Sequence, residues 1–363
     1  MVSSQKQLSM LFLPYLLLML VQQMPCLATS RSSSLVALAG AGNQTVNEEV
    51  EALLTWMSKL DSGSRNTLSS WNGSNPCSWR GIDCDPLGSV ANLSDSAIHG
   101  MLHHLNFPHL PNLVTLKLAN NQLFGNIPPG ISDLSKLTRL KLSRNNLSEN
   151  IPTQLKSLRS LQLLDLRDND LSGPIPIEIF SLSNLTELYL SVNKLSGFIP
   201  KEIGRPGSLR SLQVLDRRDN NLTGPIPNEI IGLSSLTGLY LSNNKLFGVI
   251  PQEIGRLKSL IFRHIADNRI DGPIPSSIGN MSSLLKLWLF RNQLVGSIPK
   301  EIGKLGSLSE LDLSSNYLNG SIPTTLGNLS NLAFLYLYDN QLSGPIPLEV
   351  GGMRSLIHFQ LLN

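Results

Sequence analysis

Four histidines stand close together in the sequence and form the densest group of side chains that could bind a metal ion. They are His99, His103, His104 and His109. Zinc sites combine imidazole with thiolate or carboxylate ligands at characteristic spacings. No carboxylate follows such a spacing in this irregular stretch. We therefore expect no metal site here, and we expect no cofactor elsewhere in the chain.

Residue patterns of catalysis are also missing. The sequence contains no nucleophile with a paired base, no acid/base pair, and neither the Gly-rich loop nor the His-Arg-Asp and Asp-Phe-Gly motifs of a kinase. The formal net charge is only +3 over 363 residues, and no patch rich in Lys and Arg has interleaved aromatics. A nucleic-acid partner is therefore not expected. The composition favours a binding protein over an enzyme.

Residues 1–30 have the organisation of a secretory signal peptide. Lys6 supplies a positive charge, Leu8–Val21 is a short apolar core, and cleavage is expected after Ala28 or Ser30. A membrane anchor is the alternative, but the run is shorter than the roughly 20 residues that a spanning helix needs. No second stretch of that length follows. We expect a secreted chain, or one at the extracellular face of the plasma membrane, with no membrane span of its own.

The three cysteines are interpreted in that context. Cys26 lies in the predicted leader, while Cys77 and Cys84 are close neighbours. An even pair at short spacing in a secreted chain is typical of a disulfide. A zinc site would need further ligands nearby, and no convincing ones are present. We predict a disulfide between Cys77 and Cys84.

Asn-x-Ser/Thr sequons occur throughout the chain and accept N-glycans in exported proteins. Eight of them are expected acceptors, namely Asn72, Asn92, Asn146, Asn184, Asn221, Asn280, Asn319 and Asn328. A ninth, Asn43, precedes them. Sequons also arise by chance in sequence rich in Asn and Ser, so we expect several rather than all to be used.

An internal repeat fills most of the chain, which is the signature of a solenoid. The template is Leu-x-Leu-x-x-Asn-x-Leu-x-Gly-x-Ile-Pro, and its Asn recurs at 121, 145, 169, 193, 220, 244, 268, 292, 316 and 340. Every interval is 24 residues except that from Asn193 to Asn220, which is 27. The Ile-Pro pair is present in all ten units and the Gly in nine, with Glu149 as the exception.

This leucine-rich-repeat pattern assigns a structural role to each position. Leu-x-Leu forms a short strand with its Leu side chains inward, and strands of successive coils stack into one parallel sheet. The template Asn turns inward and satisfies backbone groups, which builds a ladder from Asn121 to Asn340. Gly permits a tight backbone path. Stability comes from neighbouring coils, because no single coil can bury its own apolar face.

The domain boundaries follow from the repeat. We expect the signal peptide at 1–30, a linker at 31–46, an N-terminal cap at 47–95, and leucine-rich repeats at 96–363 with ten full 24-residue units and partial ends. In the cap, Asn47 is expected to begin a helix. Beyond the last full unit, Phe359 and Leu361 start a further strand without a visible cap, which favours a truncated ectodomain or a gene fragment.

The sequence resembles the ectodomains of plant leucine-rich-repeat receptor-like kinases and receptor-like proteins. The resemblance is carried by Glu51–Trp56, Leu68–Trp71, Asn75–Cys84 and the Leu-Ser-Gly-x-Ile-Pro repeat, and it covers nearly all of the mature chain. It implies an α/β solenoid, a right-handed superhelix with a concave parallel sheet, an extra short strand per coil and a helical, disulfide-bonded cap. It also implies recognition of a secreted peptide or protein ligand, or of a co-receptor kinase ectodomain. The Arg-x-Arg pair with which several such receptors hold a peptide carboxylate is absent.

Exposed strand positions predict the binding residues. Aromatic side chains gather four and two residues before the template Asn, mostly in the later coils, and Trp, Tyr and Arg are frequent interface anchors. The predicted ligand-binding residues are Tyr189, Tyr240, His264, Trp288, Phe290, Arg291, Tyr336 and Tyr338. The sharpest hypothesis is a hot spot at Trp288, Phe290 and Arg291. The alternative is that aromatics simply suit strands.

Earlier coils are basic on or beside the same positions, with Lys117, Arg139, Lys141 and Arg144. This patch indicates either an acidic or sulfated partner or an ordinary solvated charged face.

Two arginines conflict with the repeat. Arg217 and Arg263 replace inward Leu residues, and a buried unpaired charge is costly. We therefore expect each to be paired or displaced outward, with a local irregularity of the solenoid near Arg217.

Three functions follow from these observations. The first is a receptor-type ectodomain that binds a ligand or co-receptor in cell-surface signalling. The second is a soluble inhibitor of a secreted cell-wall-degrading enzyme, similar to the polygalacturonase-inhibiting proteins, whose cysteine-bearing C-terminal cap is absent here. The third, an enzyme, has no support in the residues.

Overall fold

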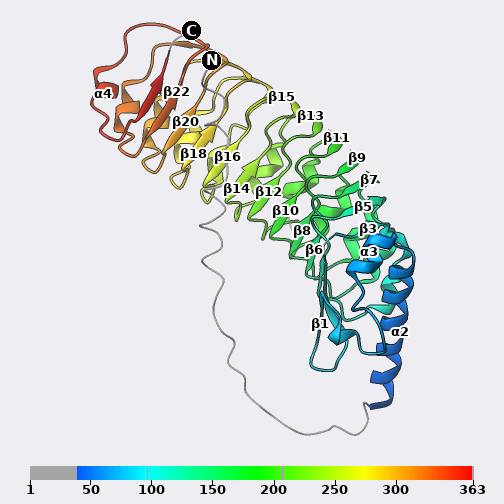
Figure 1. Ribbon diagram of the computed structural model, residues 1–363. Coiled ribbons are helices and arrows are strands. Elements are labelled where there is room, and N and C mark those ends of the chain that lie inside the picture. The colour runs from blue at the N-terminus through cyan, green and yellow to red at the C-terminus, as the bar shows by residue number, and fades with distance from the viewer. Residues whose placement is uncertain (1–38, 96, 206–207, 362–363) are drawn as a thin grey trace, which may run out of the picture. The chain divides into compact units, whose positions relative to one another are not determined.

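The structure is a computed structural model that describes residues 39–95, 97–205 and 208–361, with side chains from residue 46 onward. The chain divides into two compact units, Met1–Gly40 and Ala41–Asn363, and nearly all described residues belong to the second. The predicted signal peptide at 1–30 and most of the linker lie outside the described residues. Within the second unit the coils stack in sequence order from α2 to α4 (Figure 1).

Each coil of the array contributes one strand to each of two sheets. The first, which we call the concave sheet, has 13 strands, and all neighbours in it are parallel except β1 and β2. Its strands are β1 Ile82–Cys84, β2 Val90–Ser94, β4 Thr115–Lys117, β6 Arg139–Lys141, β8 Leu163–Asp165, β10 Glu187–Tyr189, β12 Val214–Asp216, β14 Gly238–Tyr240, β16 Phe262–His264, β18 Lys286–Trp288, β20 Glu310–Asp312, β22 Phe334–Tyr336 and β24 His358–Gln360.

The second sheet has 11 parallel strands, one per coil. They are β3 His99–Gly100, β5 Gln122–Gly125, β7 Asn146–Asn150, β9 Asp170–Pro174, β11 Lys194–Phe198, β13 Asn221–Gly224, β15 Lys245–Val249, β17 Arg269–Gly272, β19 Gln293–Gly296, β21 Tyr317–Gly320 and β23 Gln341–Leu342. These strands are the extra short strand per coil that the family resemblance implied, so this prediction is confirmed.

Short helices complete the coils after the Ile-Pro pair, whose proline removes a backbone donor and fixes φ. They are the 3-10 helices η4 Pro129–Asp133, η5 Thr153–Ser157, η6 Ile177–Ser181, η7 Lys201–Gly204, η8 Asn228–Gly232, η9 Ile254–Arg256, η10 Ser276–Asn280, η11 Lys300–Lys304 and η12 Thr324–Asn328, and the α-helix α4 Leu348–Gly351. Earlier 3-10 helices are η1 Pro76–Ser78, η2 Leu102–His104 and η3 Phe107–His109. One core of buried Leu and Ile side chains runs through all coils.

The template asparagines form the predicted ladder. Asn292, for example, accepts a hydrogen bond from the backbone N–H of Ile270 at 3.0 Å and donates to the carbonyls of Ile265, Leu289 and Phe290 at 2.9–3.2 Å. The same bonds recur from coil to coil. Each Asn therefore ties the bend of its own coil to the preceding coil, and the inward amide is fully used.

The residue before each ladder Asn adopts a left-handed backbone conformation, which the sequence pattern did not reveal. Most of these positions hold Asn, Asp or Ser, but Val192 has φ +56° and Arg291 has φ +49°. Asn and Asp tolerate this region, whereas a β-branched residue there is strained. Glu149, which stands where nine coils have Gly, is also left-handed at φ +66°.

Relief of this strain gives the first testable expectation. Val192→Asn should raise the free energy of unfolding by about 1 kcal/mol, because asparagine tolerates the left-handed conformation that valine resists. The reverse change at an equivalent position, Asn243→Val, should lower it by a similar amount. Urea unfolding followed by circular dichroism measures both. Equal stability of Val192→Asn and the parent chain would contradict the strain at this position.

The N-terminal cap joins helices to the first coil. Helix α2 spans Ala39–Ser58 and α3 spans Ser62–Thr67. The predicted disulfide between Cys77 and Cys84 is present. In α2 the buried Glu49 accepts hydrogen bonds from Ser89 and from the Val90 backbone. Burial raises the pKa of the Glu49 carboxyl, and the two hydrogen bonds oppose that shift.

The start of the cap helix differs from expectation. We predicted that Asn47 begins it, but α2 starts at Ala39, inside the predicted linker 31–46. No proline lies between Ala39 and Asn47 to interrupt the helix, so the helix extends past the potential capping residue. Beyond α2 the rings of Trp56, Trp71 and Trp79 lie in series, with centroids 6.2 Å and 5.6 Å apart, and cover the first coil.

The two core arginines contradict the prediction that they would be paired or displaced outward. Arg217 and Arg263 are 0% exposed, and in the described structure their guanidinium nitrogens have no hydrogen-bond partner. The strands that carry or precede them stay in register with their neighbours. The three extra residues of the long coil are absorbed before β12 instead, where η7 ends at Gly204 and Leu209 has φ +20°.

Candidate functional site

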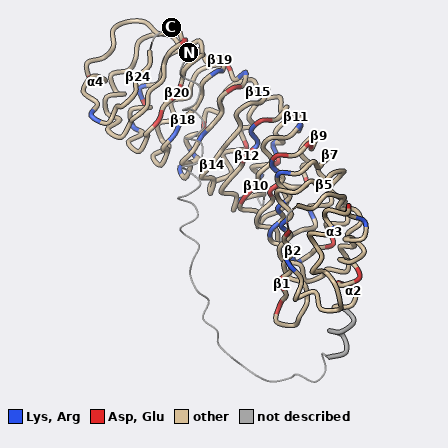
Figure 2. The backbone as a smooth tube through the Cα atoms, in the orientation of Figure 1, with Lys and Arg blue, Asp and Glu red and all other residues tan. Residues whose placement is uncertain are grey.

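Alternation along the concave strands decides which residues are available to a ligand. In β18 the middle residue Leu287 is buried, whereas Lys286 and Trp288 on either side are partly exposed. The same pattern places the predicted columns of residues on the open face of the sheet. In Figure 2 charges of both signs are scattered along the array rather than gathered in one part.

Three of the predicted residues form a continuous aromatic stack across neighbouring coils. The ring of His264 lies against Trp288 at 3.9 Å and 24°, and Tyr240 meets His264 edge-on at 4.9 Å and 81°. Phe290 extends the stack, with its centroid 6.3 Å from that of Trp288. Parallel strands spaced about 4.8 Å apart bring these rings together. We call Tyr240, His264, Trp288 and Phe290 the aromatic stack.

Cations border the aromatic stack at both ends. The guanidinium of Arg218 lies 5.1 Å from the Tyr240 ring centroid, and Lys286 Nζ lies 5.3 Å from that of Trp288. Each cation also has a carboxylate partner. Arg218 bonds Asp216 at 2.9 Å, and Lys286 bonds Glu310 at 2.9 Å. These groups hold the rim of the stack in place and present charge beside an apolar surface.

The remaining predicted residues lie apart from this stack. Tyr189 is two coils earlier, where its hydroxyl donates to Glu187 at 2.8 Å. Tyr336 and Tyr338 are two coils later, and Tyr336 contacts the ring of His358 at 5.2 Å. Arg291 belongs to the bend after the strand and pairs with Asp267 at 3.4 Å. Of the three residues of the predicted hot spot, Trp288, Phe290 and Arg291, only the two aromatic residues lie together on the strand face.

A repeated polar motif was absent from the predicted set. Asp165 is buried and binds Arg167 at 2.8 Å, while Ser143 of the preceding coil donates to Asp165 at 3.1 Å. Arg167 in turn lies 4.4 Å from the ring centroid of Tyr189. Two coils later Asp216, Arg218, Ser191 and Tyr240 repeat the arrangement. The Asp-x-Arg spacing, which puts both side chains on one face of a strand, was the available signal.

The predicted basic patch occupies the early coils. Lys117 and Arg139 are exposed and Lys141 is half-buried, and all three lie on neighbouring strands β4 and β6. Arg144 is in a bend and donates to Asn120 at 3.2 Å. Within the described residues none of the four forms an ion pair. The patch therefore carries uncompensated positive charge four to seven coils from the aromatic stack.

The environment of His264 keeps its imidazole neutral. The side chain is 9% exposed, and burial, with smaller contributions from Arg218 and Lys286, lowers its pKa from 6.5 to about 3. In the described structure His264 Nε2 and Trp288 Nε1 are both buried without a hydrogen-bond partner. Two such nitrogens in one cluster mean that the stack is not optimised for stability alone.

The depressed pKa of His264 makes stability depend on pH. Between pH 6.5 and pH 3 the unfolded chain binds a proton that the folded imidazole does not, so the folded state loses stability as the pH falls. The expected loss is about 1 kcal/mol per pH unit in this window. His264→Phe retains a ring and removes the titration. Its stability should depend less on pH than that of the parent, and identical pH profiles would contradict a buried neutral His264.

The histidines of the first coil do not assemble a metal site. His103 and His104 have ring centroids 3.7 Å apart, and His99 lies 3.5 Å from Asp61. No group of three or more His, Cys, Asp or Glu side chains in the described ranges is placed to hold a metal ion. None of the helices in these described ranges combines the length and the apolar character needed to span a lipid bilayer.

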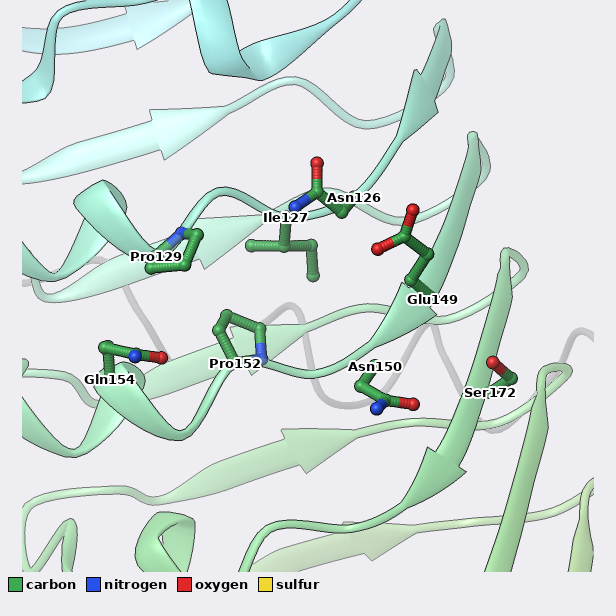
Figure 3. Close-up of a pocket in the computed structure, with 8 residues that line it drawn as sticks. All are labelled: Asn126, Ile127, Pro129, Glu149, Asn150, Pro152, Gln154 and Ser172. Atoms are coloured by element: carbon green, nitrogen blue, oxygen red, sulfur yellow. The ribbon is translucent and has the colours of Figure 1, made fainter.

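A shallow groove of about 440 Å³ lies away from the concave sheet, between β7 and the 3-10 helices η4 and η5 (Figure 3). Its lining is mixed, with Ile127, Pro129 and Pro152 beside the polar Glu149, Asn150 and Gln154. Glu149 is the only acidic or basic residue among those that line it. The groove contains no catalytic pair and none of the predicted binding residues.

The eight expected glycan acceptors lie on different faces. Asn92 is half-buried in β2 of the concave sheet, and the other seven are exposed. Asn146, Asn221 and Asn319 belong to the second sheet. Asn280 and Asn328 end the helices η10 and η12.

Comparison with known families supports the repeat assignment. Residues 46–85 match the leucine rich repeat N-terminal domain. Residues 111–171 match a leucine rich repeat family, and residues 184–205, 235–257, 307–329 and 331–353 match a second leucine rich repeat family. The first match coincides with the cap helices and the disulfide loop, and the others coincide with the coils.

The relatives of this chain include plant receptor kinases. The Arabidopsis thaliana leucine-rich repeat receptor-like serine/threonine-protein kinase RGI4 is 38% identical over 97 residues, which is 26% of this chain and 9% of that protein. Among solved structures, the plant peptide hormone receptor RGFR1 in complex with RGF2 has a TM-score of 0.75 and 40% identity, covering 79% of this chain and 45% of the receptor chain.

A third similar protein is the ectodomain of the Arabidopsis thaliana membrane receptor kinase GASSHO1/SCHENGEN3 in complex with CASPARIAN STRIP INTEGRITY FACTOR 2. Its TM-score is 0.80 and its identity 36%, over 86% of this chain and 41% of that chain. The chain spans less than half the length of each of these relatives. Fold, cap and repeats together show that the chain belongs to the leucine-rich-repeat proteins and resembles the ectodomains of plant leucine-rich-repeat receptor kinases.

Proposed function

We propose that this chain is an extracellular ligand-binding ectodomain that recognises a secreted peptide, or a partner protein such as a co-receptor kinase ectodomain, in cell-surface signalling. The observation that carries this proposal is the aromatic stack on the open face of the concave sheet. Large rings with polar rims are the residues from which binding hot spots are built. Catalysis is no part of the proposed function.

The chemistry of the site defines the ligand it would take. Trp288 and Phe290 offer an apolar surface for one anchor side chain, and the rings of Tyr240 and His264 continue it across two further coils. Arg218 and Lys286 stand at its borders. An extended segment with an apolar residue flanked by acidic groups or carbonyl oxygens matches this arrangement. A neutral His264 adds no repulsion toward a cationic ligand and no attraction for an anionic one.

The similar solved receptors are consistent with this choice. RGFR1 is a peptide hormone receptor determined with RGF2, and the GASSHO1/SCHENGEN3 ectodomain was determined with CASPARIAN STRIP INTEGRITY FACTOR 2. The Asp-x-Arg motifs at Asp165 and Asp216 hold arginines on the same face. They extend the candidate surface toward earlier coils, and a ligand longer than the stack would follow them.

A displayed library of short random peptides tests the proposal. Peptides are selected on the parent chain, and their dissociation constants are compared with those for the variant Trp288→Ala/Phe290→Ala. Loss of a hot spot of about 2 kcal/mol corresponds to binding weaker by about 30-fold. The matched control is Phe247→Ala, which removes a ring that is 49% exposed on the second sheet.

Two results are decisive. Binding that falls only in the concave double variant supports the proposed site. Binding that survives in that variant, or that falls as much in Phe247→Ala, places recognition elsewhere and overturns it.

A further inference from the structure

The second sheet carries exposed aromatic rings that the proposed function does not use. Phe198 is 64% exposed, Tyr317 52% and Phe247 49%, and Phe124 is half-buried in the same sheet. Single exposed apolar residues are ordinary, but a series of them along one face calls for something that covers it. Phe124, Phe247 and Tyr317 stand at outward positions, because the residue beside each of them on the strand is a buried leucine, and Phe198 is exposed at the end of β11.

Glycan acceptors occupy the same outward positions. Asn146, Asn221 and Asn319 are exposed in β7, β13 and β21, and each begins an Asn-x-Ser/Thr sequon. On a strand, residues two apart point to the same side, and neighbouring strands are about 4.8 Å apart. Whether a ring and an acceptor can touch is therefore decided by the register of the sheet.

The register brings every sequon of the described second sheet next to a ring. Phe124 of β5 is the direct partner of Asn146. Phe198 of β11 is the direct partner of Thr223, which is the third residue of the Asn221 sequon. Tyr317 and Asn319 stand two residues apart on the same strand and the same side.

We propose that these three asparagines carry N-glycans and that the first sugar of each glycan packs on the neighbouring aromatic ring. The pairs are Asn146 with Phe124, Asn221 with Phe198, and Asn319 with Tyr317. The inference goes beyond ligand binding and rests on the extracellular location that is part of the proposed function. The groups that cover these rings are then sugars attached to the chain itself.

The attachment is a group transfer from a lipid-pyrophosphate-linked oligosaccharide. The Asn Nδ2 forms a bond to C1 of the reducing-end N-acetylglucosamine, and the bond between C1 and the phosphate oxygen breaks. The lipid pyrophosphate leaves with the bonding electrons, and the amide gives up one proton. The C–H face of the attached sugar can then lie on the electron-rich face of the ring.

The geometry of Phe198 fits a ring that is covered from outside. A Cβ placed on Gly224 would lie 2.1 Å from the Phe198 Cδ1 atom and 2.7 Å from Cε1. The ring therefore lies down against the sheet over a residue that has no side chain. Phe198 is 64% exposed, so its other face is open to solvent, and its register partner Thr223 belongs to the Asn221 sequon.

Controls are present in the same chain. Asn280 and Asn328 are exposed sequons at the ends of 3-10 helices, outside the second sheet. Phe247 is an exposed ring of the second sheet whose direct partner is Arg269 and not a sequon residue. Tyr338 is a partly exposed tyrosine beside the concave sheet, away from all three pairs.

The test uses the full chain secreted from eukaryotic cells. Glycopeptide mass spectrometry gives the occupancy of each sequon. Nitration of Tyr317 is then timed in the parent protein, in protein trimmed by an endoglycosidase that leaves only the first sugar, and in Asn319→Gln. We expect nitration several-fold slower in the parent and in the trimmed protein than in Asn319→Gln. The nitration rate of Tyr338 should be equal in all three.

A second measurement tests the pair of Phe198 and Asn221, whose residues belong to neighbouring strands. The melting temperature is compared in a cycle of Phe198→Ser and Asn221→Gln. If the sugar packs on the ring, Phe198→Ser lowers the melting temperature more in the glycosylated protein than in the Asn221→Gln background. Phe247→Ser in the same two backgrounds should show no such difference.

Outcomes separate this inference from the proposed function. Occupancy at Asn319 without protection of Tyr317 by the first sugar overturns the packing alone. Unoccupied Asn146, Asn221 and Asn319 beside occupied Asn280 and Asn328 overturn the assignment of the sites. A chain with no glycan at any sequon would contradict both the inference and the extracellular location.

Discussion

Arg217→Leu and Arg263→Leu are each expected to raise the free energy of unfolding by about 3 to 5 kcal/mol. Both guanidinium groups are fully buried, and their nitrogens have no hydrogen-bond partner in the described structure. Burial alone lowers the pKa of each from 12.5 to about 9. A shift of this size corresponds to a penalty of several kcal/mol for the charged form. The other coils have leucine at these two positions, except for Ile265 at the position equivalent to Arg217.

The contacts of the two arginines explain why leucine should be accepted. Arg217 lies over the ring of Phe180 at 5.2 Å, and Arg263 stands in register between Leu239 and Leu287. Both environments are apolar, so substitution removes a buried charge without breaking a hydrogen bond, and at Arg217 it also removes the contact with the Phe180 ring. Arg269→Leu serves as the control, because Arg269 is exposed on the second sheet and its removal should change stability by less than about 0.5 kcal/mol.

Alkaline pH provides a second check on the same residues. Between pH 9 and pH 12.5 the arginine loses its proton in the folded chain but keeps it in the unfolded chain. The free-energy cost of burying its charge in the parent chain therefore shrinks as the pH rises. The stability difference between Arg217→Leu and the parent should therefore narrow above pH 9. If either leucine variant is less stable than the parent, the arginine has a stabilising partner and its burial is not the defect inferred here.

Asn292→Ala is expected to lower the free energy of unfolding by about 3 kcal/mol. The substitution leaves the Ile270 N–H and three carbonyl groups without their partner in the interior of the array. Each buried polar group deprived of its hydrogen bond costs about 1 to 3 kcal/mol, with partial relief from water. Because one of the three carbonyls belongs to Phe290, the change should also loosen the edge of the aromatic stack.

Urea unfolding measures the loss, and hydrogen exchange of the Ile270 amide locates it. Asn228→Ala is the matched control, since Asn228 is exposed in η8 and does not belong to the ladder. An Asn292→Ala chain as stable as the control would show that the ladder contributes little to the stability of the coils.

The regular part of the fold could be predicted from the sequence because it is set by local repetition. The regular spacing of the template asparagines from Asn121 to Asn340 predicted the ladder, and the Leu-x-Leu segments predicted the concave sheet. Both features depend only on a period that every coil repeats. The disulfide between Cys77 and Cys84 followed from short spacing. The extra strand of each coil came from the family resemblance and is confirmed by β3 to β23.

Departures from the repeat were harder to predict, because they depend on neighbours in space. Arg217 and Arg263 were expected at inward positions, but only the folded surroundings show that their guanidinium nitrogens have no hydrogen-bond partner among the described residues. The three extra residues before Asn220 did not disturb β12, since the loop after η7 could absorb them while the strand register was held by both neighbours. The helix start at Ala39 was not predicted, because the side chain of Asn47 is suited to capping a helix whether or not it does so in the fold.

The candidate site was predicted in part. Tyr240, His264, Trp288 and Phe290 were identified from column position and do come together. The burial of His264 was not foreseen, because its 9% exposure arises from the two rings on either side of it. Arg291 was placed with them from adjacency in sequence, but its left-handed backbone puts it in the bend, where it pairs with Asp267.

Photo-crosslinking tests most directly whether the concave aromatic surface is the binding site. A benzoylphenylalanine replaces Phe290 in one protein and Phe247 in another, and each is irradiated with short peptides selected on the parent chain. We expect the peptide to be attached at position 290 and not at position 247. Attachment at position 247 with none at position 290 would show that the ligand lies on the second sheet and would contradict the proposed site.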